Sequence, residues 1–134
     1  MLNQTPLKAG HRLPRPGPSQ CLQAFTDFGR LLGADAPIHY DPSYAAKPPF
    51  GTVIAHGPFL LASFETWFCE LFGDEAWSQS GRLAAKFISP AKVGEKVTLE
   101  ITVSDVTPSR ATFELRVLHD QRLLALGSAK IDLA

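Results

Sequence analysis

The sequence predicts an α+β fold in which one antiparallel sheet packs against a long buried helix. The helix is indicated by an apolar stretch, residues 57–72, which opens with Gly57-Pro58 and stops at Gly73. Proline suits the first helical position, and a helix that is apolar on every side is expected to be buried on every side. The sheet is indicated from residue 97 onward, where apolar and polar residues alternate between turn sequences.

The other elements follow in chain order. A first helix is expected over residues 19–32, because Ser19 suits an N-cap and Gly33 suits the first position beyond the helix end. Before it, residues 13–18 (LPRPGP) form a non-helical connector. Residues 82–89 have a mixed pattern, and successive antiparallel hairpins are expected from the strands at 97–103, 113–117 and 124–131.

Length and composition limit the classes of protein. A chain of 134 residues with 45% hydrophobic content fits one domain spanning residues 1–134. Its net charge of zero provides no basic excess for nucleic-acid phosphates. Two glutamates interrupt the apolar stretch, which is too short to span a membrane.

The remaining compositional signals concern location and ligands. The residues after Met1 lack the pattern of a signal peptide, and Cys21 and Cys69 lie in apolar surroundings, where we expect buried free thiols. A cytoplasmic location is therefore expected. No cluster of His, Cys, Asp or Glu has the spacing of metal ligands, and no glycine-rich phosphate loop is present, so neither a metal nor a cofactor is expected.

Three segments carry a family resemblance. They are PIHYDPSYA (37–45), PFGTVIAHG (49–57) and FISPAKVGEKV (87–97), with the apolar helix between the last two. In type and order they resemble the MaoC-like hydratases, which include the (R)-specific enoyl-CoA hydratases, over nearly the whole chain. The resemblance implies a hot-dog fold, in which an antiparallel sheet wraps around a long central helix, and a homodimer or higher homo-oligomer. It also implies substrates that are thioesters of CoA or of an acyl carrier protein.

The resemblance also implies a mechanism. In the family an Asp and a His activate water for syn addition to a trans-2-enoyl thioester, and a backbone N–H at the start of the helix polarises the thioester carbonyl. By position, His39 matches the catalytic histidine and Gly57 the carbonyl-binding glycine. The place of the family's Asp holds Ala34, and the place of an accompanying Asn holds Ala36. Asp35 comes one residue too late, and a shift of one residue in an extended segment turns a side chain to the opposite face.

Glu65 is a second candidate for the missing carboxylate. It interrupts the apolar helix, where an unpartnered charge is costly and a carboxylate is expected to face a cavity or a partner. Its position eight residues after Gly57 resembles that of an acidic residue in some hot-dog acyl-CoA thioesterases, which attacks the thioester or activates water. A structural alternative is pairing with Arg82 or Lys86, or a place in a dimer interface.

Three further residues lie in the same motifs. His56 and Tyr44 are candidate substrate-binding residues, although His56 can instead stabilise a turn. Asp41 precedes Pro-Ser and suits the cap of a turn.

Three functions therefore stay open from the sequence. The first is hydration and dehydration of acyl thioesters, with His39 as acid–base residue and Asp35 or Glu65 as its carboxylate partner. The second is thioester hydrolysis through Glu65. The third is binding of acyl thioesters without catalysis, which the alanines at positions 34 and 36 suggest.

Overall fold

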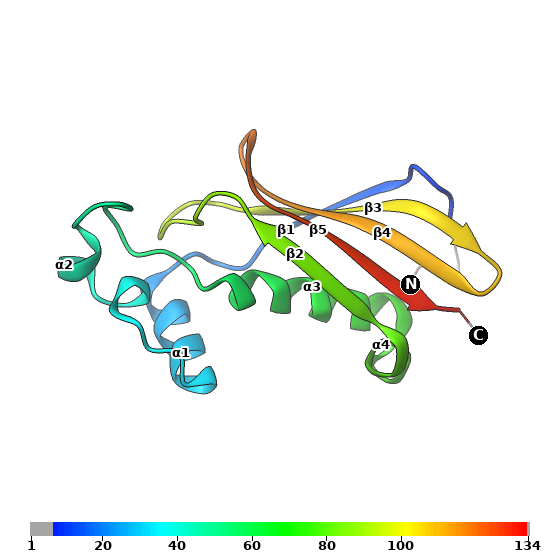
Figure 1. The fold of residues 1–134 in the computed structure, drawn as a ribbon, viewed down its shortest axis with the longest axis horizontal. Helices are drawn as coiled ribbons and strands as arrows, with labels where there is room; N and C mark the ends of the chain where they lie inside the picture. Colours follow the sequence, from blue (N-terminus) through cyan, green and yellow to red (C-terminus); the bar gives the residue numbers. More distant parts are fainter. Residues whose placement is uncertain (1–6, 134) are drawn as a thin grey trace.

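The computed structural model describes residues 7–133 and contains one antiparallel five-stranded sheet in the order β1-β3-β4-β5-β2 (Figure 1). The strands are β1 (Arg12–Pro16), β2 (Arg82–Phe87), β3 (Thr98–Thr107), β4 (Arg110–His119) and β5 (Arg122–Asp132). The helices are α1 (Leu22–Leu32), α2 (Pro42–Ala45), α3 (Gly57–Phe72) and α4 (Asp74–Ser80), and Pro37–His39 forms a 3-10 turn. Helix α3 runs along one face of the sheet, with α1 and α2 at its N-terminal end.

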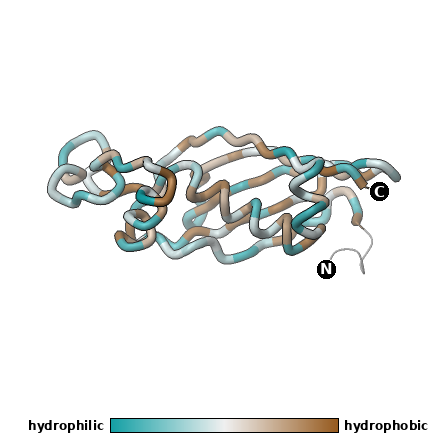
Figure 2. The backbone as a smooth tube through the Cα atoms, turned by 90° about the horizontal axis from the view of Figure 1, so that it is seen from below, coloured by the Kyte–Doolittle hydropathy of each residue, from teal (hydrophilic) through white to brown (hydrophobic). Residues whose placement is uncertain are grey.

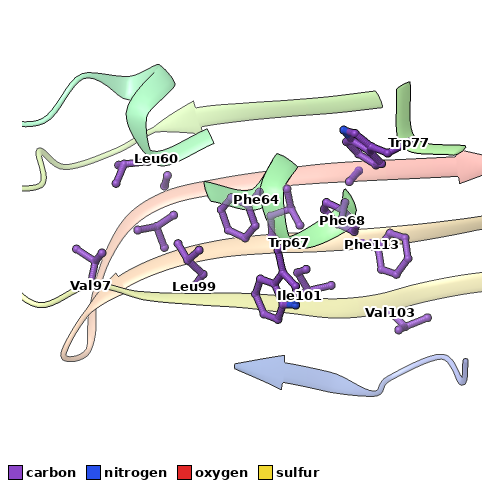
Figure 3. Packing of buried hydrophobic residues seen from close by; sticks show 14 of the residues in the cluster. Leu60, Phe64, Trp67, Phe68, Trp77, Val97, Leu99, Ile101, Val103 and Phe113 are labelled. Carbon is purple, nitrogen blue, oxygen red and sulfur yellow. The ribbon is translucent and has the colours of Figure 1, made fainter. Parts of the chain in front are cut away.

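The core lies between α3 and the sheet. Alternate residues of β3 and β4 are buried, which confirms the predicted half-buried strands and the hairpin between them. From the helix, Leu60, Phe64 and Phe68 point toward these strands (Figure 3). Helix α3 begins and ends at the residues that the Gly57-Pro58 and Gly73 signals predict.

The expectation that α3 is buried on every side is wrong for this chain. Its buried residues Leu60, Phe64, Trp67 and Phe68 share one face, because residues three or four apart lie side by side on a helix. In the view from the helix side, none of the described segments covers the opposite face (Figure 2). A single sheet can cover only one side of a helix, and Glu65 lies on the exposed side.

Residues 12–16 correct a second expectation. They form strand β1 instead of a plain connector, and they pair with β3. Two prolines are tolerated in this strand because β1 lies at the edge of the sheet, where one side of the strand has no hydrogen-bonding neighbour among residues 7–133.

The ends of the helices give further corrections. Helix α1 begins after Cys21, and Ser19 does not cap it. The predicted end is confirmed, since Gly33 has φ 68°, a left-handed conformation that glycine adopts at little cost. Cys21 is exposed and Cys69 is only half-buried, so the expectation of buried thiols is wrong. Helix α4 was not predicted at all.

Among residues 7–133, no helix combines the length and the apolar character needed to cross a membrane.

Candidate active site

The candidate site lies at the N-terminal end of α3, where α1, the 3-10 turn and α2 gather (Figure 1). A small apolar cluster of Phe25, Ala45 and Val53 holds these segments together. The ring of Phe59, in the first turn of α3, packs edge-on against two rings of α1, with centroids 5.5 Å from Phe25 and 5.3 Å from Phe28. These contacts fix the segment that leaves α1 against the start of α3.

His39 ends the 3-10 turn and is half-buried. Its Nδ1 lies 2.8 Å from the Ile54 carbonyl oxygen, and because a carbonyl only accepts, Nδ1 donates its proton there. The other ring nitrogen, Nε2, then carries the lone pair. Nε2 has no partner among the described residues and is not sealed from solvent. Burial lowers the pKa of His39, although the Ile54 hydrogen bond opposes that shift.

His56 is the N-cap residue of α3 and is only 5% exposed. Its Nε2 donates to the Ala34 carbonyl oxygen at 2.8 Å. Its ring stacks on His39, with centroids 3.8 Å apart and an angle of 23° between the planes. Phe28 packs against the same ring at 5.5 Å. The sequence placed His56 beside the helix start, but only the tertiary structure brings the two imidazoles together.

Gly57 is the first residue of α3. Within residues 7–133, no acceptor receives a hydrogen bond from its N–H. The first N–H groups of a helix lack partners inside the helix and carry a partial positive charge, which suits a developing oxyanion. A Cβ at this position would come within 2.7 Å of the Phe87 ring, so a larger residue here would displace that ring.

A cavity of about 360 Å³ joins these two groups and is called here the front cavity. His39 and Gly57 both line it, together with apolar side chains from α3, β2 and the loops: Phe50, Leu60, Phe87 and Pro90. The arrangement places a proton acceptor and a backbone donor on the wall of one mainly apolar cavity, as acid–base chemistry on a carbonyl compound requires.

A smaller cavity of about 200 Å³, the rear cavity, borders the other side of His39. His56, Arg30, Asp35 and Tyr40 also line it. The structure thus brings Asp35 and His39 to one cavity, but no hydrogen bond joins their side chains in the described part of the chain, and Asp35 is exposed. Ala34 contributes its carbonyl, which accepts from His56, where the family's pattern has a carboxylate.

Comparisons with known proteins identify the family and the fold. The family profile described as the MaoC like domain matches residues 21–122. The chain belongs to the MaoC-like dehydratase family. A 3-hydroxybutyryl-CoA dehydratase of Methylorubrum extorquens is 32% identical to this MaoC-like chain over 84 residues, which are 62% of the chain and 52% of the relative. The chain therefore spans about half the length of this curated relative.

Solved structures agree on the fold. The (R)-hydratase of A. caviae superposes with a TM-score of 0.83 at 23% identity, over 97% of the MaoC-like chain and 99% of that protein. An unliganded R-hydratase of Pseudomonas aeruginosa gives 0.80 at 22% identity, over 93% and 81%. The predicted α+β hot-dog fold is confirmed.

Two predicted site residues of the MaoC-like chain lie away from both cavities. Glu65 is exposed and lies eight residues along α3 from Gly57, about 12 Å at the rise of a helix. Within residues 7–133 it forms no ion pair with Arg82 or Lys86. Tyr44 is exposed on α2, where the Lys47 ammonium lies 5.9 Å from its ring centroid. The structure therefore does not bring Glu65 or Tyr44 to His39.

Sequence reasoning missed Phe87, whose ring lies against Gly57. The residue sits at the end of edge strand β2, and nothing in its local pattern indicates contact with a helix start thirty positions earlier. The signal for His56 was present, because a histidine directly before the helix-opening Gly57-Pro58 must lie near the first N–H groups of the helix.

The predicted cap at Asp41 is confirmed in the MaoC-like chain. Its Oδ1 accepts from the backbone N–H of Ser43 at 3.0 Å and of Tyr44 at 3.3 Å, which starts α2 directly after the His39 turn.

Replacing Asp41 with alanine leaves these two N–H groups without their side-chain acceptor. We expect the free energy of unfolding to fall by about 1 kcal/mol, the usual cost of a lost N-cap. Urea denaturation followed by circular dichroism measures it. Asp41→Asn keeps an acceptor oxygen and serves as the control, and an Asp41→Ala midpoint equal to that of wild type contradicts the prediction.

Proposed function

We propose that this chain is a hydratase/dehydratase that reversibly adds water to a trans-2-enoyl thioester, carried by CoA or by an acyl carrier protein. The observation that carries the proposal is the shared front cavity, which is lined by His39 and by Gly57, whose N–H has no acceptor among residues 7–133. The name of the Methylorubrum extorquens relative, a 3-hydroxybutyryl-CoA dehydratase, supports the same class of reaction.

The thioester carbonyl binds at the start of α3. As hydroxide adds to C3, the C2–C3 π electrons move toward the carbonyl oxygen, which gains negative charge. The Gly57 N–H donates to that oxygen, and the partial positive charge of the helix end stabilises it. Phe50, Leu60 and Phe87 cover the acyl group with apolar surface and exclude bulk water, which strengthens these electrostatic interactions.

His39 moves the proton. Its Nε2 lone pair accepts a proton from the attacking water while the water oxygen bonds to C3, and the imidazolium returns a proton to C2. In the reverse direction the same nitrogen removes the C2 proton and protonates the departing hydroxyl. The lowered pKa of His39 suits this role, because the ring stays neutral and able to accept a proton at neutral pH.

The test is turnover by the purified chain. Crotonyl-CoA and longer trans-2-enoyl-CoA esters should lose the absorbance of the conjugated thioester and yield 3-hydroxyacyl-CoA, while a thiol reagent detects no free CoA. Release of free CoA from saturated acyl-CoA supports the thioesterase alternative instead, and binding without any turnover supports a non-catalytic role. Either result contradicts the proposal.

We also propose that the chain assembles as a homodimer through the edge of the sheet at β2. Beside that edge strand, three large apolar side chains are exposed: Phe87 at 46%, Ile88 at 52% and Leu126 at 40%. An open, partly apolar strand edge favours pairing with another strand. Sedimentation at micromolar concentration should give the mass of a dimer, and a monomer contradicts the proposal.

A cytoplasmic location stays a prediction, which fractionation of the source cells tests.

A further inference from the structure

The site has a second histidine, His56, beside His39. In the part of the chain that the structure describes, no carboxylate hydrogen-bonds to His39. The His39 ring instead stacks on the ring of His56, with centroids 3.8 Å apart. At 5% exposure His56 is among the few buried polar side chains, and the reaction proposed above assigns it no step.

Each ring is anchored on a different backbone carbonyl. His39 donates through Nδ1 to Ile54, and His56 donates through Nε2 to Ala34, both at 2.8 Å. These two bonds fix which nitrogen of each neutral ring carries the proton. The side chain of His56 is therefore hydrogen-bonded to the segment that leaves α1, and its backbone caps α3. The His39 ring stacks on the His56 ring.

We propose that His56 is a positioning residue for His39. Its stacked imidazole holds the His39 ring in one orientation, with Nδ1 on the Ile54 carbonyl and Nε2 as the accessible base, and disfavours a positive charge on that ring. His56 thereby orients the base without exchanging protons with substrate. This inference rests on the proposed function for its catalytic meaning, but it concerns a property of His39 that can be measured without substrate.

The stacked arrangement also disfavours a positive charge on His39. Two protonated imidazoles at this distance repel, and the burial of His56 weakens the screening of that repulsion by water. The other titratable groups that line the rear cavity beside His39 are Arg30, Asp35 and Tyr40, and all three are exposed. The front cavity has no titratable side chain apart from His39 among its described lining residues. In agreement, the pKa of His39 is lowered by burial first and by the nearby His56 as a smaller cause.

Two variants of His56 separate its functions. Glutamine places an amide N–H where Nε2 donates, so His56→Gln retains the bond to Ala34 but removes the stacked ring. Phenylalanine retains a stacking ring but removes the ring nitrogens, and with them the donor to Ala34. His11→Gln is the matched control, because His11 is exposed and lies outside both cavities.

The primary readout is the titration of His39 in ¹⁵N-histidine-labelled protein without substrate, with His39→Asn used to assign its resonances. We expect the His39 midpoint to rise in both His56 variants and to stay unchanged in His11→Gln. Where the protein turns over enoyl-CoA, the acidic limb of kcat/KM should move to higher pH in the same two variants.

An unchanged His39 midpoint in folded His56→Gln and His56→Phe overturns the inference, even if kcat/KM falls, since a uniform loss at every pH is what a merely structural residue gives. A shifted midpoint in a protein that hydrates no enoyl thioester leaves the inference standing and overturns the proposed function instead. Circular dichroism of each variant verifies that the compared proteins are folded.

Discussion

The His39→Asn variant should hydrate enoyl thioesters with a kcat/KM about 10²- to 10⁴-fold below that of the unaltered chain, the usual contribution of one general acid–base group. Asparagine retains an N–H that can reach the Ile54 carbonyl, where His39 Nδ1 donates at 2.8 Å. It has no counterpart of Nε2, so the variant loses the proton acceptor while the loop keeps its anchor. Initial rates with crotonyl-CoA, together with the thermal midpoint, measure both consequences.

The same role of His39 also predicts how kcat/KM depends on pH. Because the pKa of His39 is lowered from its ordinary value of 6.5, the ring stays neutral to lower pH than a free histidine. The kcat/KM of the unaltered protein should therefore hold through neutrality and fall only below about pH 6.5, as His39 becomes protonated. The His39→Asn variant should lack that limb. A variant with full activity, or one whose loss is matched by His11→Gln, contradicts the role of His39.

The Gly57→Ala variant should show a second large loss, with kcat/KM lower by on the order of 10²-fold, the cost of misplacing reacting groups by about 1 Å. An added Cβ would lie 2.7 Å from two carbons of the Phe87 ring, so the ring must move. Both residues line the front cavity, and a displaced ring or the new methyl group occupies the approach to the Gly57 N–H. Steady-state kinetics on crotonyl-CoA measures the loss.

A double variant tests whether contact with the Phe87 ring causes the loss of kcat/KM in Gly57→Ala. Removing the ring in Gly57→Ala/Phe87→Ala relieves the contact, so kcat/KM should recover relative to Gly57→Ala, with Phe87→Ala alone as the reference. No recovery in a folded double variant means that the methyl group itself blocks the carbonyl. Wild-type kcat/KM in Gly57→Ala contradicts the placement of the substrate carbonyl at this helix end.

Local sequence signals predicted the elements whose cause is local. The Gly57-Pro58 pair and Gly73 bound α3 because proline, lacking an N–H, fits a first helical turn and glycine lets a helix stop. Alternation predicted β3 and β4 because side chains of a strand point to opposite faces in turn. The Asp41 cap was predictable for the same kind of reason, since its acceptor serves N–H groups two and three residues away.

Burial was predicted less well because it depends on how many layers surround an element. The apolar character of α3 suggested a helix enclosed on all sides, and Glu65 was therefore a candidate both for the missing carboxylate and for a structural ion pair. In the structure the sheet covers one face, and Glu65 lies on the other, away from His39 and Gly57. Strand β1 was not predicted for a related reason. Its prolines argue against a central strand, but they are tolerated at the edge of a sheet, which is where β1 lies.

By itself, the sequence determined the bounds of the long helix α3, the hairpin of β3 and β4, the α+β class and the two groups at the centre of the candidate site, His39 and Gly57, because these follow from local propensity and from motifs that resemble a known family. Only the tertiary structure decided what surrounds them: the His56 ring stacked on His39, the Phe87 ring against Gly57, and the exposure of Glu65 on the uncovered side of α3. The two ring contacts join residues 17 and 30 positions apart, and their geometry is set by how helices and sheet pack together, which no local pattern encodes.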